Sequence, residues 1–293
     1  ELRSIVNPEL KTHLEAVLGS KVLRYKSVSG GDIANAYAIE TATNLFFVKT
    51  SSKPWAEELF RSESRGLKQL KATKTIKVPQ VYAEGVLDPI GYLVLEFIES
   101  KRPSSKDFER LGQQLAALHQ VPQPNQFGAP IDNYIGHLPQ SNTMKSRWAT
   151  FYVEQRLLPQ IHLAQNKGLL KSETMPSKAK MEEICSYISG DVIPSLLHGD
   201  LWAGNFLIAL DGTPVLIDPS TYVGHSEVDL AMSRLFGGFG ASFYDAYYEL
   251  IAPHPEQKDL ISIYQLYSLL VHLNLFGKSY KNSVLGIINK YFR

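Results

Sequence analysis

The stretch LLHGDLWAGNFLIALDGTPVLID, residues 196–218, carries the strongest signal for the fold class of this chain. Asp200 and Asn205 stand five residues apart in its first half. The apolar segments FLI and VLI follow, and the turn DGTP between them predicts a hairpin that ends at Asp218. Either half alone would be typical of ordinary turns, which favour Gly, Asp and Asn. The catalytic-loop spacing, the hairpin and the final acid together are far more specific.

This arrangement is typical of phosphoryl-transfer enzymes, in which an Asp and an Asn of the catalytic loop stand five residues apart. We therefore predict that Asp200 is the catalytic base, which orients a substrate hydroxyl and accepts its proton. Asn205 and Asp218 are the predicted magnesium ligands, because Mg²⁺ prefers hard oxygen ligands and takes few of them from the protein. ATP is the predicted phosphoryl donor.

Such an enzyme also needs a lysine that holds the ATP phosphates and a glutamate that orients this lysine. Lys49, at the end of the predicted strand NLFFVKT, fits the first role, and Glu63 in the following helical pattern fits the second. Glu57 and Glu58, earlier in the same pattern, are competitors for the glutamate role. Exposed lysines and glutamates are common, so their order relative to Asp200 is what favours the functional interpretation.

Two further segments are predicted to bind ATP. Gly30 and Gly31 lie in SGGDIANAY, just before the lysine strand, where their backbone amides would cover the phosphates. The segment departs from the GxGxxG pattern, so a plain hairpin turn is an equal alternative. Glu96, Phe97 and Ile98, in the apolar segment YLVLEFIES, are predicted to bind adenine through their backbone groups.

Composition limits the class of protein. The chain has 293 residues, is 44% hydrophobic and 20% charged, and carries a formal net charge of +1, which gives no electrostatic case for a nucleic-acid or membrane-surface partner. The single cysteine, Cys185, permits no intrachain disulfide. No signal peptide and no apolar run long enough to span a bilayer is evident, so a cytoplasmic location is expected.

The order of predicted elements favours an α+β fold with two lobes, like that of protein kinases. A strand-rich N-lobe of residues 1–99 with one inserted helix is expected to bind nucleotide, and a mainly helical C-lobe of residues 100–293 to carry catalysis and substrate binding. The segment SKRPSSKD connects them. The periodicity predicts a hairpin within 36–50, a helix over 55–70, strands within 78–87 and 90–99, helices over 106–119, 146–166 and 178–188, and a long loop over 121–142.

Three stretches resemble the fructosamine kinase family, bacterial type, within the wider group of aminoglycoside and choline kinases. They are HGDLWAGN, IDPSTYVGHSEVDLAMSRLFGGF and DNYIGHLPQSNTMKSRWATFYVEQRLLPQ. The resemblance implies ATP- and Mg²⁺-dependent phosphorylation of ketoamines such as fructosamine or ribulosamine at O3, on small amines or protein lysines, which favours deglycation. It assigns the base, metal ligands and lysine–glutamate pair to the residues given above. Asp32 stands where eukaryotic members have a cysteine, so no redox switch is expected there.

The same resemblance suggests residues that meet the substrate. Trp202 could pack against a sugar, or could equally anchor the loop from below. A carboxylate in the segment after Asp218 could meet a substrate ammonium, but a structural network is at least as plausible there. The candidate substrate residues are Trp202, His225, Glu227, Asp229, Asn133, Tyr134 and Gln140.

Two rival functions stay open. The chain could be another small-molecule kinase of this fold, acting on an aminoglycoside, choline or homoserine. It could also be a pseudokinase that serves as a nucleotide-binding scaffold. The presence of Lys49, Glu63, Asp200, Asn205 and Asp218 together disfavours the scaffold.

Overall fold

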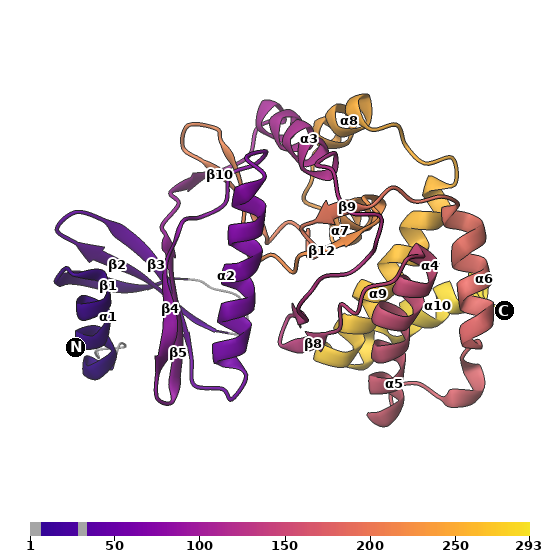
Figure 1. Cartoon of the computed structure of the whole chain (residues 1–293), viewed down its shortest axis with the longest axis horizontal. Coiled ribbons are helices and arrows are strands. Elements are labelled where there is room, and N and C mark those ends of the chain that lie inside the picture. Colours follow the sequence, from indigo (N-terminus) through magenta and orange to yellow (C-terminus); the bar gives the residue numbers. More distant parts are fainter. Residues whose placement is uncertain (1–6, 29–33) are drawn as a thin grey trace. The chain divides into compact units, whose positions relative to one another are not determined.

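The structure is a computed structural model that describes residues 7–28 and 34–293 (Figure 1). It contains two compact units, one of Glu1–Pro103 with Leu207–Asp218, the other of Ser104–Phe206 with Pro219–Arg293. The sequence placed the first boundary after residue 99, and it assigned the 207–218 hairpin to the second lobe. In the structure, residues 207–218 belong to the first compact unit. The roles assigned to the two lobes remain predictions.

The first unit contains a five-stranded antiparallel sheet in the order β1-β2-β3-β5-β4. The predicted hairpin is confirmed by β2 (Asn35–Thr41) and β3 (Leu45–Ser51), which pair with Tyr37 opposite Val48. The two predicted later strands are β4 (Val81–Leu87) and β5 (Ile90–Glu96). The outer strand β1 spans Val22–Val28.

Two helices cover this sheet on opposite faces, α1 (Pro8–Leu18) and α2 (Ala56–Ala72) (Figure 1). Alternate residues of a strand point to opposite faces. Phe46 and Val48 are buried in a cluster with Leu10 and Leu14 of α1. Lys49 is therefore presented to the other face, where α2 carries Glu63.

A second, three-stranded sheet attaches the 207–218 hairpin to the first unit, in the order β11-β10-β6. Its strands are β6 (Ser100–Lys101), β10 (Phe206–Ala209) and β11 (Pro214–Leu216). Ile208 pairs with Lys101, and the Leu216 amide donates to the Lys77 carbonyl at 3.0 Å. These bonds fix the end of the hairpin, and therefore Asp218, within the first unit.

The second unit is mainly helical, as predicted. Its core surrounds α9 (Gln257–Phe276), which buries Leu260, Leu266 and Leu270. The other helices are α3 (Ser105–His119), α4 (Trp148–Tyr152), α5 (Leu158–Asn166), α6 (Lys178–Ser189), α7 (Glu227–Leu235), α8 (Ala241–Leu250) and α10 (Lys281–Tyr291), with short 3-10 turns at Ser172–Thr174 and Lys278–Tyr280. None of the helices in residues 7–28 and 34–293 has the length and apolar character to cross a membrane.

Two departures from the predicted elements matter for the site. The helix expected over 146–166 is interrupted by a π-helical turn, Val153–Leu157, between α4 and α5. The long loop contains a short hairpin of β7 (Asn133–Ile135) and β8 (Leu138–Gln140). Two more short strands, β9 (Ser195–Leu197) and β12 (Tyr222–Gly224), pair on either side of the catalytic-loop sequence. Periodicity is a poor guide to two- and three-residue strands, because too few side chains alternate.

Candidate active site

Lys49, Glu63 and Asp218 form a charged group inside the first unit. The Lys49 Nζ lies 2.8 Å from Glu63 Oε1 and also donates to Asp218 Oδ1. The Lys49 and Glu63 side chains are only 13% and 11% exposed, whereas Asp218 is 36% exposed. The pair predicted from strand and helix order is therefore formed, and one predicted metal ligand adjoins it.

The pKa values of this group are mutually dependent. Burial alone would lower the pKa of Lys49, but the carboxylates of Asp218 and Glu63 outweigh burial and raise it above its ordinary value. Burial raises the pKa of Glu63 to about 7, although the charge of Lys49 opposes this shift. The ammonium thus stays charged, and Glu63 is the member that can gain a proton near neutral pH.

Asp218 adopts an unusual backbone conformation, with φ of +51°. This left-handed region costs a non-glycine residue roughly 1–3 kcal/mol and is enriched at functional sites. The hairpin bonds described above hold the residue there, just beyond β11. The strain is consistent with a carboxylate that is directed for function rather than for stability.

The competing glutamates take other partners. Glu57 and Glu58 bind Arg61 at 2.7 and 2.5 Å on the exposed side of α2. This leaves Glu63 as the partner of Lys49. The predicted phosphate-covering glycines, Gly30 and Gly31, lie outside the described residues.

In the predicted adenine-binding segment, the backbone amides of Glu96 and Phe97 are already hydrogen-bonded. The Glu96 amide donates to the Gln80 carbonyl at 2.8 Å, and the Phe97 amide donates to the Leu45 carbonyl at 3.4 Å. The Glu96 carboxylate accepts from Lys77 and from the Gln80 amide. Among the described residues, the Ile98 amide has no such backbone partner, and the binding of adenine by this segment stays a prediction.

Asp200 and Asn205 are brought together in the second unit. The Asn205 Nδ2 donates to the Asp200 carbonyl at 2.8 Å and to its carboxylate Oδ2 at 3.0 Å. Because the amide nitrogen faces Asp200, Asn205 Oδ1 remains as an oxygen ligand. The five-residue spacing therefore closes a loop in which the two side chains are hydrogen-bonded, while their roles as base and metal ligand stay predictions.

The turn before Asp200 requires glycine. Gly199 has φ of +84°, and a Cβ there would lie 1.9 Å from the Ser220 carbonyl oxygen. The Ser220 amide donates to the His198 carbonyl at 2.8 Å, and His198 Nδ1 accepts from the Asp200 amide at 3.2 Å. His198 is fully buried, so it braces the loop and is not an exposed base.

The buried Asp229 carboxylate anchors this loop through hydrogen bonds. Its carboxylate accepts from the amides of His198 and Gly199 at 2.8 and 3.0 Å, and from His119 Nε2 at 3.0 Å. Burial would raise the pKa of Asp229, but these hydrogen bonds and the neighbouring histidines outweigh burial and lower it. Asp229 is fully buried, which favours the structural alternative over contact with a substrate ammonium. His119, at the end of α3, is part of this arrangement.

Trp202 packs within the loop and is also part-exposed, while its contact with a substrate stays a prediction. A Cβ on Gly204 would lie 2.3 Å from the indole Cη2, so the ring packs closely over this glycine. The residue is nevertheless 39% exposed, and its ring meets Phe236 edge to face at 6.4 Å. The indole therefore anchors the loop and still offers surface beside it.

His225 and Glu227 fit the structural alternative as well. His225 is buried, its Nδ1 lies 2.7 Å from the Tyr264 hydroxyl, and burial lowers its pKa to about 3. Glu227 is 3% exposed and accepts from Tyr248 and Gln257. Both side chains stabilise the start of α7, and neither is presented to solvent.

Asn133, Tyr134 and Gln140 fasten the long loop to the segment after Asp218. Asn133 Nδ2 donates to the Thr221 carbonyl at 2.8 Å, and the Ser220 hydroxyl donates to the Tyr134 carbonyl. Gln140 Nε2 donates to Ser220 Oγ at 3.0 Å. The side chains of Asn133 and Gln140 and the backbone carbonyl of Tyr134 thus bind within the protein, and the predicted substrate role of the three residues stays a prediction. Nothing short-range in the sequence indicates such pairs, because their members lie 80 or more residues apart.

The donor chemistry suits magnesium better than a softer metal. Within residues 7–28 and 34–293, no three His, Cys, Asp or Glu side chains are grouped so that they could hold a metal by themselves. Asn205 Oδ1 and the strained, part-exposed Asp218 are hard oxygen ligands, and Mg²⁺ commonly completes its shell with phosphate oxygens and water. Each of these two oxygens, within its own unit, is therefore of the chemical kind that Mg²⁺ takes from proteins.

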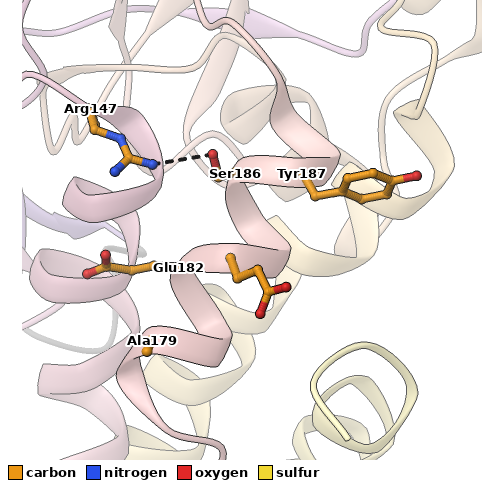
Figure 2. Close-up of a pocket in the computed structure, with 6 residues that line it drawn as sticks. Arg147, Ala179, Glu182, Ser186 and Tyr187 are labelled. Carbon is orange, nitrogen blue, oxygen red and sulfur yellow. Dashed lines mark hydrogen bonds between the residues drawn. The ribbon is translucent and has the colours of Figure 1, made fainter.

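A surface hollow elsewhere on the second unit contains none of these residues. It lies against α6 and is lined by Arg147, Ala179, Glu182, Glu183, Ser186 and Tyr187 (Figure 2). Figure 2 shows Arg147 reaching Ser186, at 3.5 Å, while Tyr187 points away along the surface. The hollow is open and its side chains are largely solvated, so it does not compete with the Asp200 loop as a reaction site.

Comparison with known proteins agrees with this geometry. A family model described as fructosamine kinase matches residues 6–293. A protein named "Probable ketoamine kinase" from Synechocystis is 38% identical over 276 residues, covering 93% of this chain and 92% of that one. The chloroplastic protein-ribulosamine 3-kinase of Arabidopsis thaliana is 36% identical over 277 residues, covering 94% and 84%.

Solved structures agree at the level of the fold. The crystal structure of a protein assigned as a fructosamine-3-kinase from Thermobifida fusca has a TM-score of 0.84 and 33% identity, covering 97% of this chain and 98% of that one. An aminoglycoside phosphotransferase, crystallised with ADP and hygromycin B, has a TM-score of 0.63 at 14% identity, covering 96% and 98%. The second likeness shows only that the α+β, kinase-like fold is shared.

Proposed function

The chain belongs to the fructosamine kinase family, and from that premise we propose that it transfers the γ-phosphoryl group of ATP to the O3 hydroxyl of a ketoamine. Fructosamine and ribulosamine, on small amines or on protein lysines, are the proposed acceptors. The observation that carries the proposal is the joint presence of the Lys49–Glu63 pair and the Asp200–Asn205 loop in their expected local geometries. Phosphorylation at O3 would favour loss of the sugar, so deglycation is the proposed outcome.

The first unit supplies the groups for the nucleotide. Lys49, kept charged by Glu63 and Asp218, is assigned to the α- and β-phosphates. Ile98 is assigned to adenine. Asp218, with Asn205 of the second unit, would hold the magnesium ion, which when bound neutralises charge on the transferring phosphoryl group.

The second unit supplies the group for the acceptor. Asp200 is assigned to orient the attacking hydroxyl and take its proton. Its position is set by the amide of Asn205 and by the turn that Asp229 holds. Trp202 is assigned to pack against the sugar or the stem of the amine, because its indole is exposed within the same loop.

The expected partners follow from this chemistry. A near-neutral chain offers no basic surface for nucleic acid, so the proposed partners are ketoamines alone. A cytoplasmic location is proposed because the chain has one buried thiol and no disulfide. The relative from Arabidopsis is named as chloroplastic, so the compartment is a proposal for this chain only.

A substrate panel tests the function directly. ADP release would be measured with ribulosamines, fructosamines, choline and kanamycin, and the phosphorylated carbon located by NMR. We expect turnover of a ketoamine with phosphate on O3. Turnover of choline or kanamycin alone would overturn the assignment, and would favour the rival small-molecule kinases of the same fold.

The pseudokinase alternative is tested by Asp200→Ala. We expect this change to abolish turnover while ATP still binds, since Lys49 and Glu63 are untouched. Turnover that survives the change would remove Asp200 from the role of base.

A further inference from the structure

The connector between α7 and α8, residues 236–240 of the second unit, contains two successive glycines in a left-handed conformation. Gly237 has φ of +71° and Gly238 has φ of +93°, a region that favours glycine because a side chain strains it. Both glycines are exposed, but their surroundings differ. A Cβ on Gly237 would meet no described atom within 4 Å beyond its chain neighbours, whereas a Cβ on Gly238 would lie 2.4 Å from Ala203 Cβ.

Ala203 lies in the turn that closes the Asp200–Asn205 loop. The Asn205 amide donates to the Trp202 carbonyl at 2.9 Å, across Ala203 and Gly204. The Asn205 side chain then donates back to Asp200. Ala203 is therefore a central residue of the turn that sets where Asn205 lies relative to Asp200. Its Cβ is bonded directly to the backbone, so this atom cannot move unless the turn moves with it.

Two aromatic contacts hold the connector against the same loop. Phe236 meets Trp202 edge to face, with 6.4 Å between the ring centres. Phe239 meets Phe206, the residue after Asn205, with 4.9 Å between the ring centres. The connector and the loop therefore run alongside each other, with the close glycine contact between the two aromatic pairs.

The connector has little freedom to move away from the turn. Phe239 packs against Phe243 of α8 at 4.8 Å and against Phe108 of α3 at 6.4 Å between ring centres. A Cβ on Gly240 would lie 2.8 Å from the Phe108 ring, so the end of the connector is closely packed as well. Two carbon atoms need roughly 3.5–4 Å, so a side chain at position 238 requires a movement of about 1 Å or more. Because α3 and α8 hold the connector, we expect the turn to move.

We propose that Gly238 is a positioning residue for phosphoryl transfer, whose missing side chain lets the connector lie against Ala203 and thereby fixes the turn that places Asn205 beside Asp200. The role rests on the proposed function of this loop as the catalytic centre. Gly238 touches neither substrate nor nucleotide in this role and acts only through Ala203.

Gly238→Ala tests the contact, and Gly237→Ala is its matched control. Both variants place a Cβ on a left-handed backbone, so both should lower the melting temperature. Only Gly238→Ala crowds Ala203. We expect kcat for a ketoamine to fall at least about tenfold in Gly238→Ala, since small displacements of catalytic groups are costly. In Gly237→Ala, kcat should stay within about twofold of the wild type.

Ala203→Gly supplies the rescue. Without the Ala203 Cβ, the nearest atom to a Cβ at position 238 is the Cα of residue 203 at 3.7 Å, which is an ordinary contact. In the Ala203→Gly background, Gly238→Ala should therefore change kcat by less than about twofold. A loss of kcat that came from backbone strain alone would be the same in both backgrounds, so the double-mutant cycle separates the two causes.

Hydrogen exchange gives a readout that does not depend on turnover. The Asn205 amide closes the turn by its bond to the Trp202 carbonyl, and a displaced turn protects this amide less. Exchange of the Asn205 amide, followed by NMR, should be faster in Gly238→Ala than in the wild type. It should be unchanged in Gly237→Ala. In the double variant it should match Ala203→Gly.

The kinetic outcome decides the proposal. If folded Gly238→Ala keeps kcat within about twofold of the wild type, the proposal is wrong, whatever its melting temperature. Equal losses of kcat with and without Ala203→Gly would also overturn it. If Gly238→Ala does not fold, Gly238→Asn takes its place, because asparagine adopts the left-handed region more readily and its Cβ meets the same atom.

Failure of the wild type to phosphorylate any ketoamine is a separate result. It would overturn the proposed function, whereas the exchange rates of the Asn205 amide would still decide whether Gly238 positions the turn. Wild-type exchange in Gly238→Ala would then overturn that role.

Discussion

Lys49 in the first unit and Asp200 in the second are held in place by different kinds of interaction. In the first unit, Lys49 is held by two carboxylates, and the arrangement depends on charge. In the second unit, Asp200 is held by an amide side chain and by a turn whose amides converge on Asp229. The first arrangement depends on the protonation of Glu63, whereas the second depends on hydrogen-bond geometry. A change of pH near neutrality therefore alters the charge of the Lys49 group through Glu63, whereas the contacts that hold Asp200 come from amide groups.

The largest expected effect comes from removing the base itself. Asp200→Asn keeps the shape and the contact with Asn205 but cannot accept a proton. General-base catalysis contributes about 10²–10⁴-fold, so kcat should fall within that range. ATP affinity, measured by calorimetry, should change little because the Lys49 group is intact. A comparable loss of ATP affinity would show that the two arrangements are not separable.

Asp229→Asn should have the second-largest effect, because it weakens the hydrogen bonds that hold the turn before Asp200 and leaves Asp200 itself unchanged. The Asn amide has one acceptor oxygen where the carboxylate has two. At least one of the buried donors on His198, Gly199 or His119 therefore loses its hydrogen bond. Each such loss costs about 1–3 kcal/mol of unfolding free energy. We expect lower stability in urea unfolding, together with lower kcat and little change in KM for ATP.

Glu227→Gln is the matched control for Asp229→Asn, since Glu227 is also a buried carboxylate of α7. It binds Tyr248 and Gln257 and does not reach the catalytic turn. It should lower stability without lowering kcat. A selective rise in KM for the acceptor would instead restore Glu227 as a substrate residue.

Trp202→Ala should have an intermediate effect confined to the acceptor. Loss of an aromatic face that packs on the substrate should raise KM for the ketoamine by about tenfold. Trp202→Phe should recover much of this loss. Tyr187→Ala, an 86% exposed aromatic at the α6 hollow, is the control and should change nothing. Equal losses in kcat for both Trp202 variants would indicate that the indole only anchors the loop.

The smallest expected effect concerns the Lys49–Glu63–Asp218 group and is a change in the pH dependence of stability. Burial raises the folded-state pKa of Glu63 to about 7, above the ~4.3 of an exposed glutamate. Between these values the folded protein keeps a proton that the unfolded chain has lost, so the free energy of unfolding falls as pH rises. Glu63→Gln is neutral throughout and should flatten this dependence. Melting curves at pH 5 and pH 8 measure it; parallel shifts for both proteins would contradict the assignment.

Much of the site was predictable because its residues stand at fixed short spacings. Asp200 and Asn205 meet across one loop, and the hairpin carries the chain to Asp218. Lys49 and Glu63 follow from strand alternation and helix order. The sequence singled out Asp229 as a candidate but did not predict its structural role. Its burial and its contact with His119, 110 residues away, leave no pattern in the nearby sequence.

The sequence by itself determined the α+β fold class and the family, and it singled out the groups proposed to carry the chemistry, because these depend on periodicity and on motifs within about twenty residues. Tertiary structure alone decided which of the polar residues near the motifs are exposed to solvent and which form hydrogen bonds inside the protein. His225, Glu227 and Asn133 look alike in the sequence as substrate ligands, yet each is occupied by partners inside the protein. The physical reason is that buried polar groups must find partners, and those partners are chosen by packing among segments far apart in the chain.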